Sequence, residues 1–363
     1  MPTWHPWKRS SSGGDTPYRS VDAGASEALA APVSSPLLDR LAGRGQRMKL
    51  VAAGPNLVSQ QFEAFGVPCP ADSDCPAAAL TALRDGLDPT AQAYWLRFDP
   101  VHLLAHKSQL LLMDPQVLCL TPGEAKAFAA TFNNHFAELG WQVVAARPDR
   151  WYLRLPQPVH IQTTPLLAVI GQDIDRHLPK GPDALTWHTY LNEVQMLLHD
   201  HPCNQAREEA GLPVVNSVWP WGGGQLPHPL QGWWRSVAGD EPLLQSLGQF
   251  TGAHTAAFPA DVAVWVRDLA SGAHLLFYPE ILETQEKLAN FEDIVLGPLV
   301  DALKSADIAC LVLVADMDET NSGMLTVLLE RKQLHRWWRR ARPFISGQAL
   351  GEATDWRKLA TGG

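Results

Sequence analysis

The stretch from Asn192 to Pro227 constrains the fold of this chain more than any other. It reads NEVQMLLHDHPCNQAREEAGLPVVNSVWPWGGGQLP. Its periodicity predicts a helix over 183–200, a short helix over 203–210 and a strand over 212–218. The three consecutive Gly residues near its end permit positive φ and leave backbone N–H groups accessible. We therefore expect 219–224 to be a loop that either binds an anion through those N–H groups or clamps a crossing between domains.

Polar side chains of this stretch form a candidate site for a polar or anionic ligand. A run of them follows one side of the predicted helix at helical spacing: His188, Asn192, Gln195 and His199. The planar guanidinium of Arg207 suits a carboxylate or a phosphate. One alternative is an ordinary solvated helix face, and another is a metal site using His199, His201 and Glu193. The candidate ligand-binding residues are Arg150, His188, Asn192, Glu193, Gln195, His199, His201, Asn204, Arg207, Asn216, Ser217, Trp219, Trp221, Gly222, Gly223 and Gly224.

This reading predicts a binding site without catalytic residues and without metal ligands. The Gly-rich segment is neither GxGxxG nor GxxxxGK[ST], so neither nucleotide fingerprint is present. Ser217 is not in a GxSxG context, which is the setting of a nucleophilic Ser in hydrolases. We expect Arg207→Ala to remove stabilisation by a ligand with little loss of fold.

Charge and composition exclude several classes of protein. The net charge of −9 argues against a general nucleic-acid binder, because phosphate neutralisation needs a clustered excess of Lys and Arg. No apolar run reaches the roughly 20 residues of a membrane-spanning helix, and the N-terminal residues do not read as a secretory signal. The five Cys are scattered without CxxC spacing, so we expect free thiols in a reducing cytoplasm.

The part of the chain before this stretch predicts a tail followed by an α+β unit. Residues 1–47 are rich in Ser, Gly, Pro and Ala and are expected to be disordered. A buried strand is expected over 48–53. The run Thr121-Pro122-Gly123-Glu124 is typical of a helix start, with a capping Thr, a Pro at the first helical position and a Glu three residues after the cap. Strand runs at 141–146 and 151–155 predict a hairpin.

The part after Pro229 shows helices alternating with buried strands, which is typical of a doubly wound sheet. The expected helices are 243–250, 281–291 and 298–305, and the expected strands are 262–266, 275–278 and 308–315. The segment 325–343 is rich in Arg and Lys. We interpret it as a solvated edge strand or terminal helix, with an acidic partner as the alternative.

The sequence from Leu191 to Gly224 resembles the signature of the RpfE-type bacterial regulatory proteins, which are grouped with cofactor-independent phosphoglycerate mutases of the alkaline-phosphatase superfamily. The shared pattern is an Asn-x-x-Arg helix, a Gly-Leu-Pro, an Asn-bearing strand and a Gly-rich segment. Here these positions are Asn204, Arg207, Gly211-Leu212-Pro213, Asn216 and Gly222–Gly224. Asp99-Pro100, Glu124-Ala125 and Arg150-Trp151-Tyr152-Leu153 fit the same pattern, so that the resemblance covers about 94–230.

The resemblance implies an alkaline-phosphatase-like, doubly wound α/β core with an inserted α+β lid. It implies a discontinuous core at 48–93 and 238–345, a lid at 94–237 and a flexible tail at 346–363. It also implies mutase chemistry, which needs two divalent metals held by Asp and His and a Ser that takes the phosphoryl group. The first metal ligand is expected just after the first strand, where this chain has Gly54-Pro55-Asn56. A late strand is expected to end in Asp-His, and this one ends Asp316-Met317-Asp318-Glu319.

These departures favour a cytoplasmic, non-catalytic regulatory protein that needs no cofactor and recognises a small anionic or phosphorylated metabolite. The first alternative is an active phosphoglycerate mutase, or a related phosphotransferase, that uses two divalent metals. The second is a protein-interaction role. Neither nucleic acid nor a membrane is expected as a partner.

Overall fold

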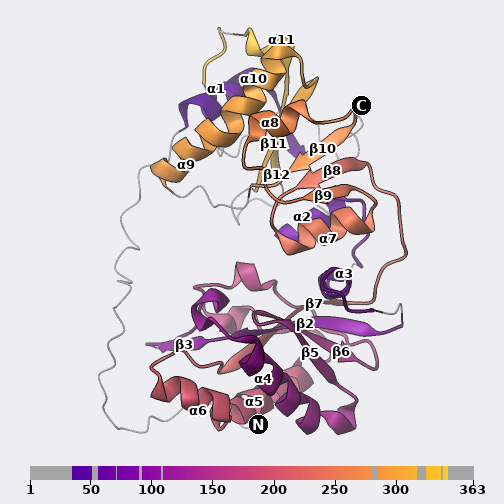
Figure 1. The fold of residues 1–363 in the computed structure, drawn as a ribbon, viewed down its shortest axis with the longest axis vertical. Coiled ribbons are helices and arrows are strands. Elements are labelled where there is room, and N and C mark those ends of the chain that lie inside the picture. The colour runs from indigo at the N-terminus through magenta and orange to yellow at the C-terminus, as the bar shows by residue number, and fades with distance from the viewer. Residues whose placement is uncertain are drawn as a thin grey trace.

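The computed structural model describes residues 35–50, 56–70, 72–89, 92–107, 109–278, 284–316, 324–336 and 338–341. The chain has a mixed α/β fold with two lobes stacked along its long axis (Figure 1). One lobe holds a four-stranded antiparallel sheet, and the other holds two three-stranded sheets. No described helix has the length and apolar character needed to cross a bilayer.

The four-stranded sheet has the order β5-β6-β2-β7. Its strands are β2 (Tyr94–Val101), β5 (Gln142–Arg147), β6 (Arg150–Leu155) and β7 (Ser217–Gly224). Every residue of β2 is buried, because helices cover both faces of the sheet. The hairpin expected from the sequence is confirmed as the antiparallel pair β5 and β6.

One face of this sheet is covered by α4 (Pro122–His135) and α5 (Ala184–His199), and the other by α3 (Ala77–Arg84). Helix α4 begins where the sequence predicts, because Thr121 and Glu124 form a reciprocal capping box. The short helix α6 (Pro202–Glu209) lies against α4. The smaller elements of this lobe are a hairpin of β3 (Leu103–His106) and β4 (Gln109–Leu112), and the short helices η1 (Pro115–Leu118), η2 (Ala137–Leu139), η3 (Leu166–Ala168) and η4 (Ile174–Arg176).

The second lobe contains an antiparallel sheet of order β1-β12-β11 and a parallel sheet of order β10-β8-β9. The antiparallel strands are β1 (Gln46–Leu50), β11 (Cys310–Asp316) and β12 (Met324–Glu330). The parallel strands are β8 (Trp234–Ala238), β9 (His254–Ala256) and β10 (Ala273–Leu276). The helices are α1 (Pro36–Arg44), α2 (Leu57–Ala64), α7 (Pro242–Phe250), α8 (Val262–Arg267), α9 (Gln285–Phe291), the π-helix η5 (Glu292–Leu296), α10 (Gly297–Ser305) and α11 (Arg331–Leu334). The doubly wound arrangement expected for this lobe stays a prediction.

The two lobes share a hydrophobic core at their junction. Helix α3 contacts α7, and Arg84 of α3 donates a hydrogen bond to Gln245 of α7. The core cluster at this level contains Phe62 from α2, Trp221 from β7 and Trp234 from β8. Burial of aromatic groups this large contributes several kcal/mol to holding the lobes together.

Several expectations about local structure are wrong. Residues 219–224 form the edge strand β7 instead of a loop, and 262–266 are helical in α8 instead of extended. Helix α1 lies inside the predicted tail 1–47, because its apolar side chains Leu38 and Leu41 pack into the core of the second lobe. In the basic segment 325–343, β12 is the central strand of its sheet instead of an edge, while Arg331–Leu334 form the short helix α11, in line with the helical half of the expectation.

The Cys prediction is wrong in part, because Cys69 and Cys75 form a disulfide. These two residues are only six positions apart, in the loop that leads into α3. Cys119, Cys203 and Cys310 are free, as expected.

Candidate functional site

Arg207 is the residue of the predicted site whose environment differs most from expectation. It lies on α6 and is only 3% exposed. Its Nε donates to the carbonyl of Pro213 at 2.7 Å, its Nη1 to Glu124 Oε1 at 2.7 Å, and its Nη2 to the carbonyl of Leu118. The guanidinium fork therefore binds groups of the chain itself, and a ligand-binding role for Arg207 stays a prediction.

The partner carboxylate, Glu124, is held in its charged form. Burial acts to raise its pKa, but hydrogen bonds from the hydroxyl and backbone N–H of Thr121, together with the Arg207 guanidinium, outweigh it. The pKa of Glu124 is therefore lowered below its usual value of 4.5. One ion pair thus fixes the start of α4 to α6.

Asn204 and Asn216 also serve the chain itself. The amide nitrogen of Asn204 donates to the carbonyls of Leu198 and Val215, both at 2.7 Å, and its oxygen accepts the Val215 N–H at 3.0 Å. Asn216 pairs with both backbone groups of Leu103 in the same way, at 2.7 and 2.8 Å. These amides satisfy the irregular backbone between α6 and β7, where no ladder is available.

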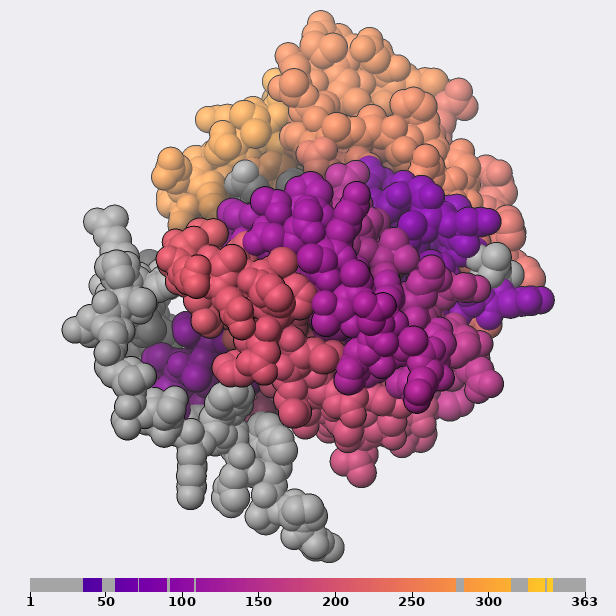
Figure 2. All heavy atoms as spheres, turned by 60° about the horizontal axis from the view of Figure 1, so that its bottom comes forward, coloured from indigo at the N-terminus to yellow at the C-terminus, as the bar shows by residue number. Residues whose placement is uncertain are grey.

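The polar residues of α5 lie toward the outside of the lobe. Asn192 and His199 are exposed, and Gln195 is half-buried. His188 hydrogen-bonds through Nε2 to the carbonyl of Pro179 at 2.9 Å, and Glu193 lies 3.7 Å from His135. Figure 2 shows this side of the lobe, with the red-pink residues of α6 lying against the magenta residues of α4. A ligand-binding role for the α5 residues stays a prediction.

His201 is buried between α4 and α6. Its ring stacks on Phe128 with centroids 4.3 Å apart, its Nε2 lies 3.0 Å from Thr131 Oγ1, and its Nδ1 accepts the Cys203 N–H. Burial lowers the pKa of His201, so the neutral form is favoured. The residue caps α6 at its N-terminus.

The Gly-rich segment donates a backbone N–H to a carboxyl group of the chain itself, that of Asp74. Gly223 N–H donates to Asp74 Oδ2 at 3.3 Å, and Gly222 N–H donates to Thr163 Oγ1 at 3.2 Å. Thr163 in turn donates through its own N–H to Asp74 Oδ1 at 2.9 Å. Burial raises the pKa of Asp74, and these hydrogen bonds act against that rise.

Glycine is needed in this strand for reasons of space. A Cβ at Gly223 would lie 2.6 Å from the Tyr94 hydroxyl, and one at Gly224 would lie 2.6 Å from Pro76 Cβ. Gly222 has φ +64° and would meet Ala77 at 2.9 Å. Gly222 and Gly224 therefore let α3 and its preceding loop approach the sheet, and Gly223 makes room for side chains of β2.

The face of the sheet under α3 carries a buried ion pair that the sequence analysis did not identify. Asp99 is completely buried and its Oδ1 accepts from Arg97 Nη2 at 2.8 Å, Arg97 Nε at 3.1 Å and Trp151 N at 3.2 Å. Its Oδ2 accepts from Trp221 Nε1 at 2.7 Å. Burial raises the pKa of Asp99, while Arg97 and Trp221 stabilise the carboxylate.

Arg150 belongs to a second buried cluster on the same face. Its Nε lies 2.7 Å from Asp85 Oδ2 and its Nη2 donates to Asp85 Oδ1 at 2.9 Å. Tyr152 donates its hydroxyl to Asp85 Oδ2 at 2.6 Å, and burial raises the pKa of Tyr152. These bonds attach the end of α3 to β6. Of the remaining predicted residues, Trp219 donates Nε1 to the Thr164 carbonyl at 2.8 Å, and Ser217 is buried.

A cavity of about 300 Å³ adjoins this region, beside η1. Its lining is Pro100, Pro115, Gln116, Leu118, Cys119, Leu120, Pro148 and Asp149. Among the described residues of this lining, the charged one is the acid Asp149, so the cavity does not suit an anion.

The described residues do not fit a two-metal centre. None of them forms a group of three or more His, Cys, Asp or Glu side chains that could hold a metal ion. Asn56, near the expected first ligand position, instead accepts the Ser59 N–H at 2.9 Å and caps α2. Gly54, Pro55 and 317–319 lie outside the described residues, as does the side chain of Asp316.

Comparison with known proteins finds similarity over part of the chain, and no family model matches it. The 2,3-bisphosphoglycerate-independent phosphoglycerate mutase of Methanothrix thermoacetophila is 34% identical over 94 residues, which is 24% of each chain. That of Methanosarcina mazei is 31% identical over 96 residues, 25% of this chain and 24% of its own. The probable enzyme of Geobacter sulfurreducens is 41% identical over 59 residues, 16% of this chain and 15% of its own.

Two solved structures cover more of the chain at lower identity. The cofactor-independent phosphoglycerate mutase from Thermoplasma acidophilum aligns over 90% of both chains, with 15% identity and a TM-score of 0.44. The PH0037 protein from Pyrococcus horikoshii aligns over 82% of this chain and 80% of its own, with 12% identity and a TM-score of 0.49. The sequence matches span about a quarter or less of the curated relatives, so this chain is similar to phosphoglycerate mutases over that part of its length.

Proposed function

We propose that this chain is a non-catalytic, phosphoglycerate-mutase-like protein that binds a small anionic or phosphorylated metabolite in a regulatory role. The sequence similarity to phosphoglycerate mutases supports the relation. In this proposal the second lobe corresponds to an alkaline-phosphatase-like core, and the four-stranded sheet with its helices corresponds to an inserted lid. The RpfE-type signature supports the regulatory role.

The observation that carries the proposal is that the residues shared with the mutase pattern are engaged inside the lobe. The guanidinium of Arg207 donates to Glu124 and to two backbone carbonyls, and the amide of Asn204 is hydrogen-bonded to the backbone of Val215. The N–H of Gly223 donates to Asp74. Groups used in this way preserve a fold and are not available for chemistry, so the resemblance supports shared architecture without requiring a shared reaction.

The departures in the metal-binding positions support the non-catalytic part of the proposal. Phosphoryl transfer by two metals depends on carboxylate and imidazole ligands that neutralise charge and activate the nucleophile. The chain has Gly54-Pro55-Asn56 where the first ligand is expected, and Asn56 has a structural role as a helix cap.

The test uses the full-length protein, purified without chelators. Its metal content is measured by elemental analysis, and conversion of 3-phosphoglycerate to 2-phosphoglycerate is assayed with and without added Mn²⁺ or Zn²⁺. Thermal unfolding is measured in parallel with 3-phosphoglycerate and with inorganic phosphate. We expect a concentration-dependent rise in Tm with 3-phosphoglycerate and no turnover.

The competing function is an active cofactor-independent phosphoglycerate mutase, and the identity to such enzymes favours it. The segments 51–55 and 317–323, which would have to supply metal ligands, lie outside the described residues. Stoichiometric Mn or Zn together with turnover would establish this alternative and refute the proposal.

A further inference from the structure

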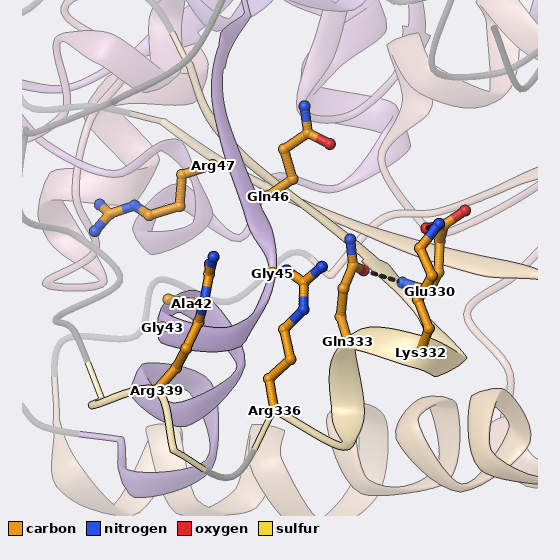
Figure 3. Close-up of a pocket in the computed structure, with 10 residues that line it drawn as sticks. All are labelled: Ala42, Gly43, Gly45, Gln46, Arg47, Glu330, Lys332, Gln333, Arg336 and Arg339. Atoms are coloured by element: carbon orange, nitrogen blue, oxygen red, sulfur yellow. Dashed lines mark hydrogen bonds and ion pairs between the residues drawn. The ribbon is translucent and has the colours of Figure 1, made fainter.

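A cavity in the second lobe is lined by basic residues, in contrast to the cavity beside η1 in the first lobe. It has a volume of about 410 Å³ and lies between the end of α1, the start of β1 and the segment that follows β12. Its lining residues, shown in Figure 3, are Ala42, Gly43, Gly45, Gln46, Arg47, Glu330, Lys332, Gln333, Arg336 and Arg339. We call this cavity the basic pocket. Its volume is within the range of small-ligand sites.

Positive charge dominates the basic pocket. Among the described residues, four cations line it with one carboxylate, Glu330, and that carboxylate lies 2.6 Å from Lys332 Nζ. Arg336 and Arg339 extend into the space beside this ion pair, whereas the Arg47 side chain extends away from Arg336 (Figure 3). In a chain of net charge −9, a cavity of opposite sign concentrates anions locally.

The arginines come from two segments that are far apart in the sequence. Arg47 is on β1 and is only 7% exposed, whereas Arg336 is half-buried and Arg339 is exposed. Figure 3 shows Arg336 and Arg339 extending alongside each other toward the start of β1. Planar guanidinium groups bind phosphate and carboxylate with two parallel hydrogen bonds, so adjacent arginines suit a ligand with more than one anionic group.

The backbone of α1 permits this arrangement. A Cβ at Gly43 would collide with the carbonyl oxygen of Arg340, and one at Gly45 would lie 2.5 Å from Val327 Cγ1. Glycine at both positions therefore lets the Arg-bearing segment lie directly against α1 and β12. The wall of the pocket on this side consists of backbone, which leaves room for a ligand between the guanidinium groups.

A purely structural explanation for the arginines accounts for only part of the cluster. Arg336 Nη1 donates to the carbonyl of Arg44 at 3.4 Å, and Arg44 Nη1 donates to the carbonyl of Leu334 at 3.1 Å. These bonds fasten the end of α1 to the last residue of α11 and to Arg336, as cations near a helix C-terminus commonly do. The bond from Arg336 is long, and a capping role does not account for the guanidinium of Arg339 beside it.

We propose that the basic pocket binds a small polyanion, a ligand that carries two phosphate groups or one phosphate and one carboxylate. This inference rests on the proposed function and gives the regulatory ligand a site. The pocket opens at the start of β1, whereas a mutase-like metal centre would follow the end of that strand. At about 3.3 Å per residue, the five residues of β1 separate the two by roughly 16 Å. The pocket is therefore a site of its own.

The test is calorimetric titration of the full-length protein with pyrophosphate, and separately with 3-phosphoglycerate. The double variant Arg336→Gln/Arg339→Gln removes two lining cations. The matched control, Arg331→Gln/Arg340→Gln, removes two exposed cations of the same segment that do not line the pocket. We expect the lining variant to weaken binding at least about tenfold and the control less than about threefold, because short-range hydrogen bonds are lost only in the first.

A third variant, Arg336→Lys/Arg339→Lys, keeps the charge and tests the guanidinium geometry. We expect it to restore part of the affinity lost in the Gln variant. Tm in phosphate-free buffer is measured for all three, so that a folding defect at the end of α1 is recognised. A Gln variant with an unchanged Tm and unchanged affinity would overturn the proposal.

Other outcomes would also overturn it. Equal weakening in the lining variant and the control would indicate a diffuse surface field instead of a site. Tighter binding of a single-stranded oligonucleotide than of pyrophosphate, with the same variant dependence, would indicate a nucleic-acid surface. If 3-phosphoglycerate stabilises the wild type and all variants alike, the pocket inference fails and the proposed function stands. If 3-phosphoglycerate is turned over, the proposed function fails, and pyrophosphate titration still decides the pocket.

Discussion

Arg207→Ala separates a ligand site from a structural scaffold more sharply than any other substitution. The sequence alone predicts that this change removes a ligand response and spares the fold. The structure predicts the reverse, because Arg207 is 3% exposed and connects α6 to Glu124, Leu118 and Pro213. The substitution leaves two backbone carbonyls and Glu124 Oε1 without the Arg207 donor, while Glu124 Oε2 keeps its bonds from Thr121.

The magnitude follows from these three contacts. Hydrogen bonds from a charged donor contribute about 1.5–3 kcal/mol each, and an acceptor left buried without a partner costs about 1–3 kcal/mol. Glu124 keeps 22% of its side chain exposed, so water recovers part of the loss on that side. Taking the two carbonyls and a reduced contribution from the ion pair, we expect a loss of about 3–5 kcal/mol in the free energy of unfolding.

The assay is urea unfolding followed by far-ultraviolet circular dichroism, with Arg154→Ala as the matched control. Arg154 is exposed and donates one hydrogen bond, to Gln142 at 3.3 Å, so its removal is expected to cost no more than about 0.5 kcal/mol. An Arg207→Ala protein that unfolds within about 1 kcal/mol of the wild type, yet no longer responds to 3-phosphoglycerate, would refute this reasoning. The candidate site of the first lobe would then be a ligand site after all.

Three further outcomes test the same lobe. Gly223→Ala is expected to cost about 1–3 kcal/mol because its Cβ would lie 2.6 Å from Tyr94 Oη and 2.8 Å from Leu96 Cδ2, whereas Gly123→Ala, inside a helix with no contact closer than 3.9 Å, is expected to be neutral or stabilising by up to about 1 kcal/mol in thermal unfolding. Trp221→Phe leaves Asp99 Oδ2 without its donor and is expected to cost about 2–3 kcal/mol in urea unfolding, a value that unchanged stability would contradict. The folded-state pKa of His201 lies below its usual 6.5, so the neutral ring stabilises the fold above pH 6.5 and this stabilisation is lost as the pH falls. In His201→Gln the free energy of unfolding is therefore expected to fall less steeply with decreasing pH than in the wild type. The same pH dependence in both proteins would argue against burial of the neutral ring.

The sequence predicts those elements whose ends are set by neighbouring residues. The start of α4 follows from Thr121, Pro122 and Glu124, which are all within one helical turn. The hairpin β5–β6 follows from two alternating runs with a short turn between them. In both places the information is local, so no knowledge of the rest of the fold is needed.

The Gly-rich segment could not be assigned in this way, because distant residues decide its conformation. Pro220 and three Gly favour a loop on local grounds, but an edge strand tolerates a Pro that lacks a donor. What makes 217–224 a strand is pairing with β2 and the close approach of α3, which only Gly permits. Neither the pairing with β2 nor the approach of α3 can be inferred from the sequence of this segment. The prediction of a strand at 262–266 is wrong for a related reason, because a short apolar run is compatible with either a strand or a buried helix.

The candidate site was also only partly predictable, because hydrogen-bonding capacity is visible in a sequence and the identity of the partner is not. The sequence analysis selected Arg150, Arg207 and the Gly N–H groups because they can bind an anion. It did not identify Asp85, Glu124 and Asp74 as the anions that they bind. Asp85 and Asp74 lie far from 192–227 in the sequence, and Glu124 belongs to a helix cap and to the family pattern, neither of which indicates that it pairs with Arg207.

This pattern of internal neutralisation separates the two lobes. In the first lobe the two arginines of the predicted site pair with carboxylates of the chain itself. Arg150 lies 2.7 Å from Asp85, and Arg207 lies 2.7 Å from Glu124. An external anion would have to displace those carboxylates, which are held at high local concentration by the fold, and so it would bind weakly there. Among the described residues that line the basic pocket, the carboxylate of Glu330 pairs with Lys332, so an incoming polyanion can contact Arg336 and Arg339 without displacing it from them. An acidic chain that needs an anionic ligand therefore gains most from a site where its own carboxylates are scarce, and the basic pocket meets that condition.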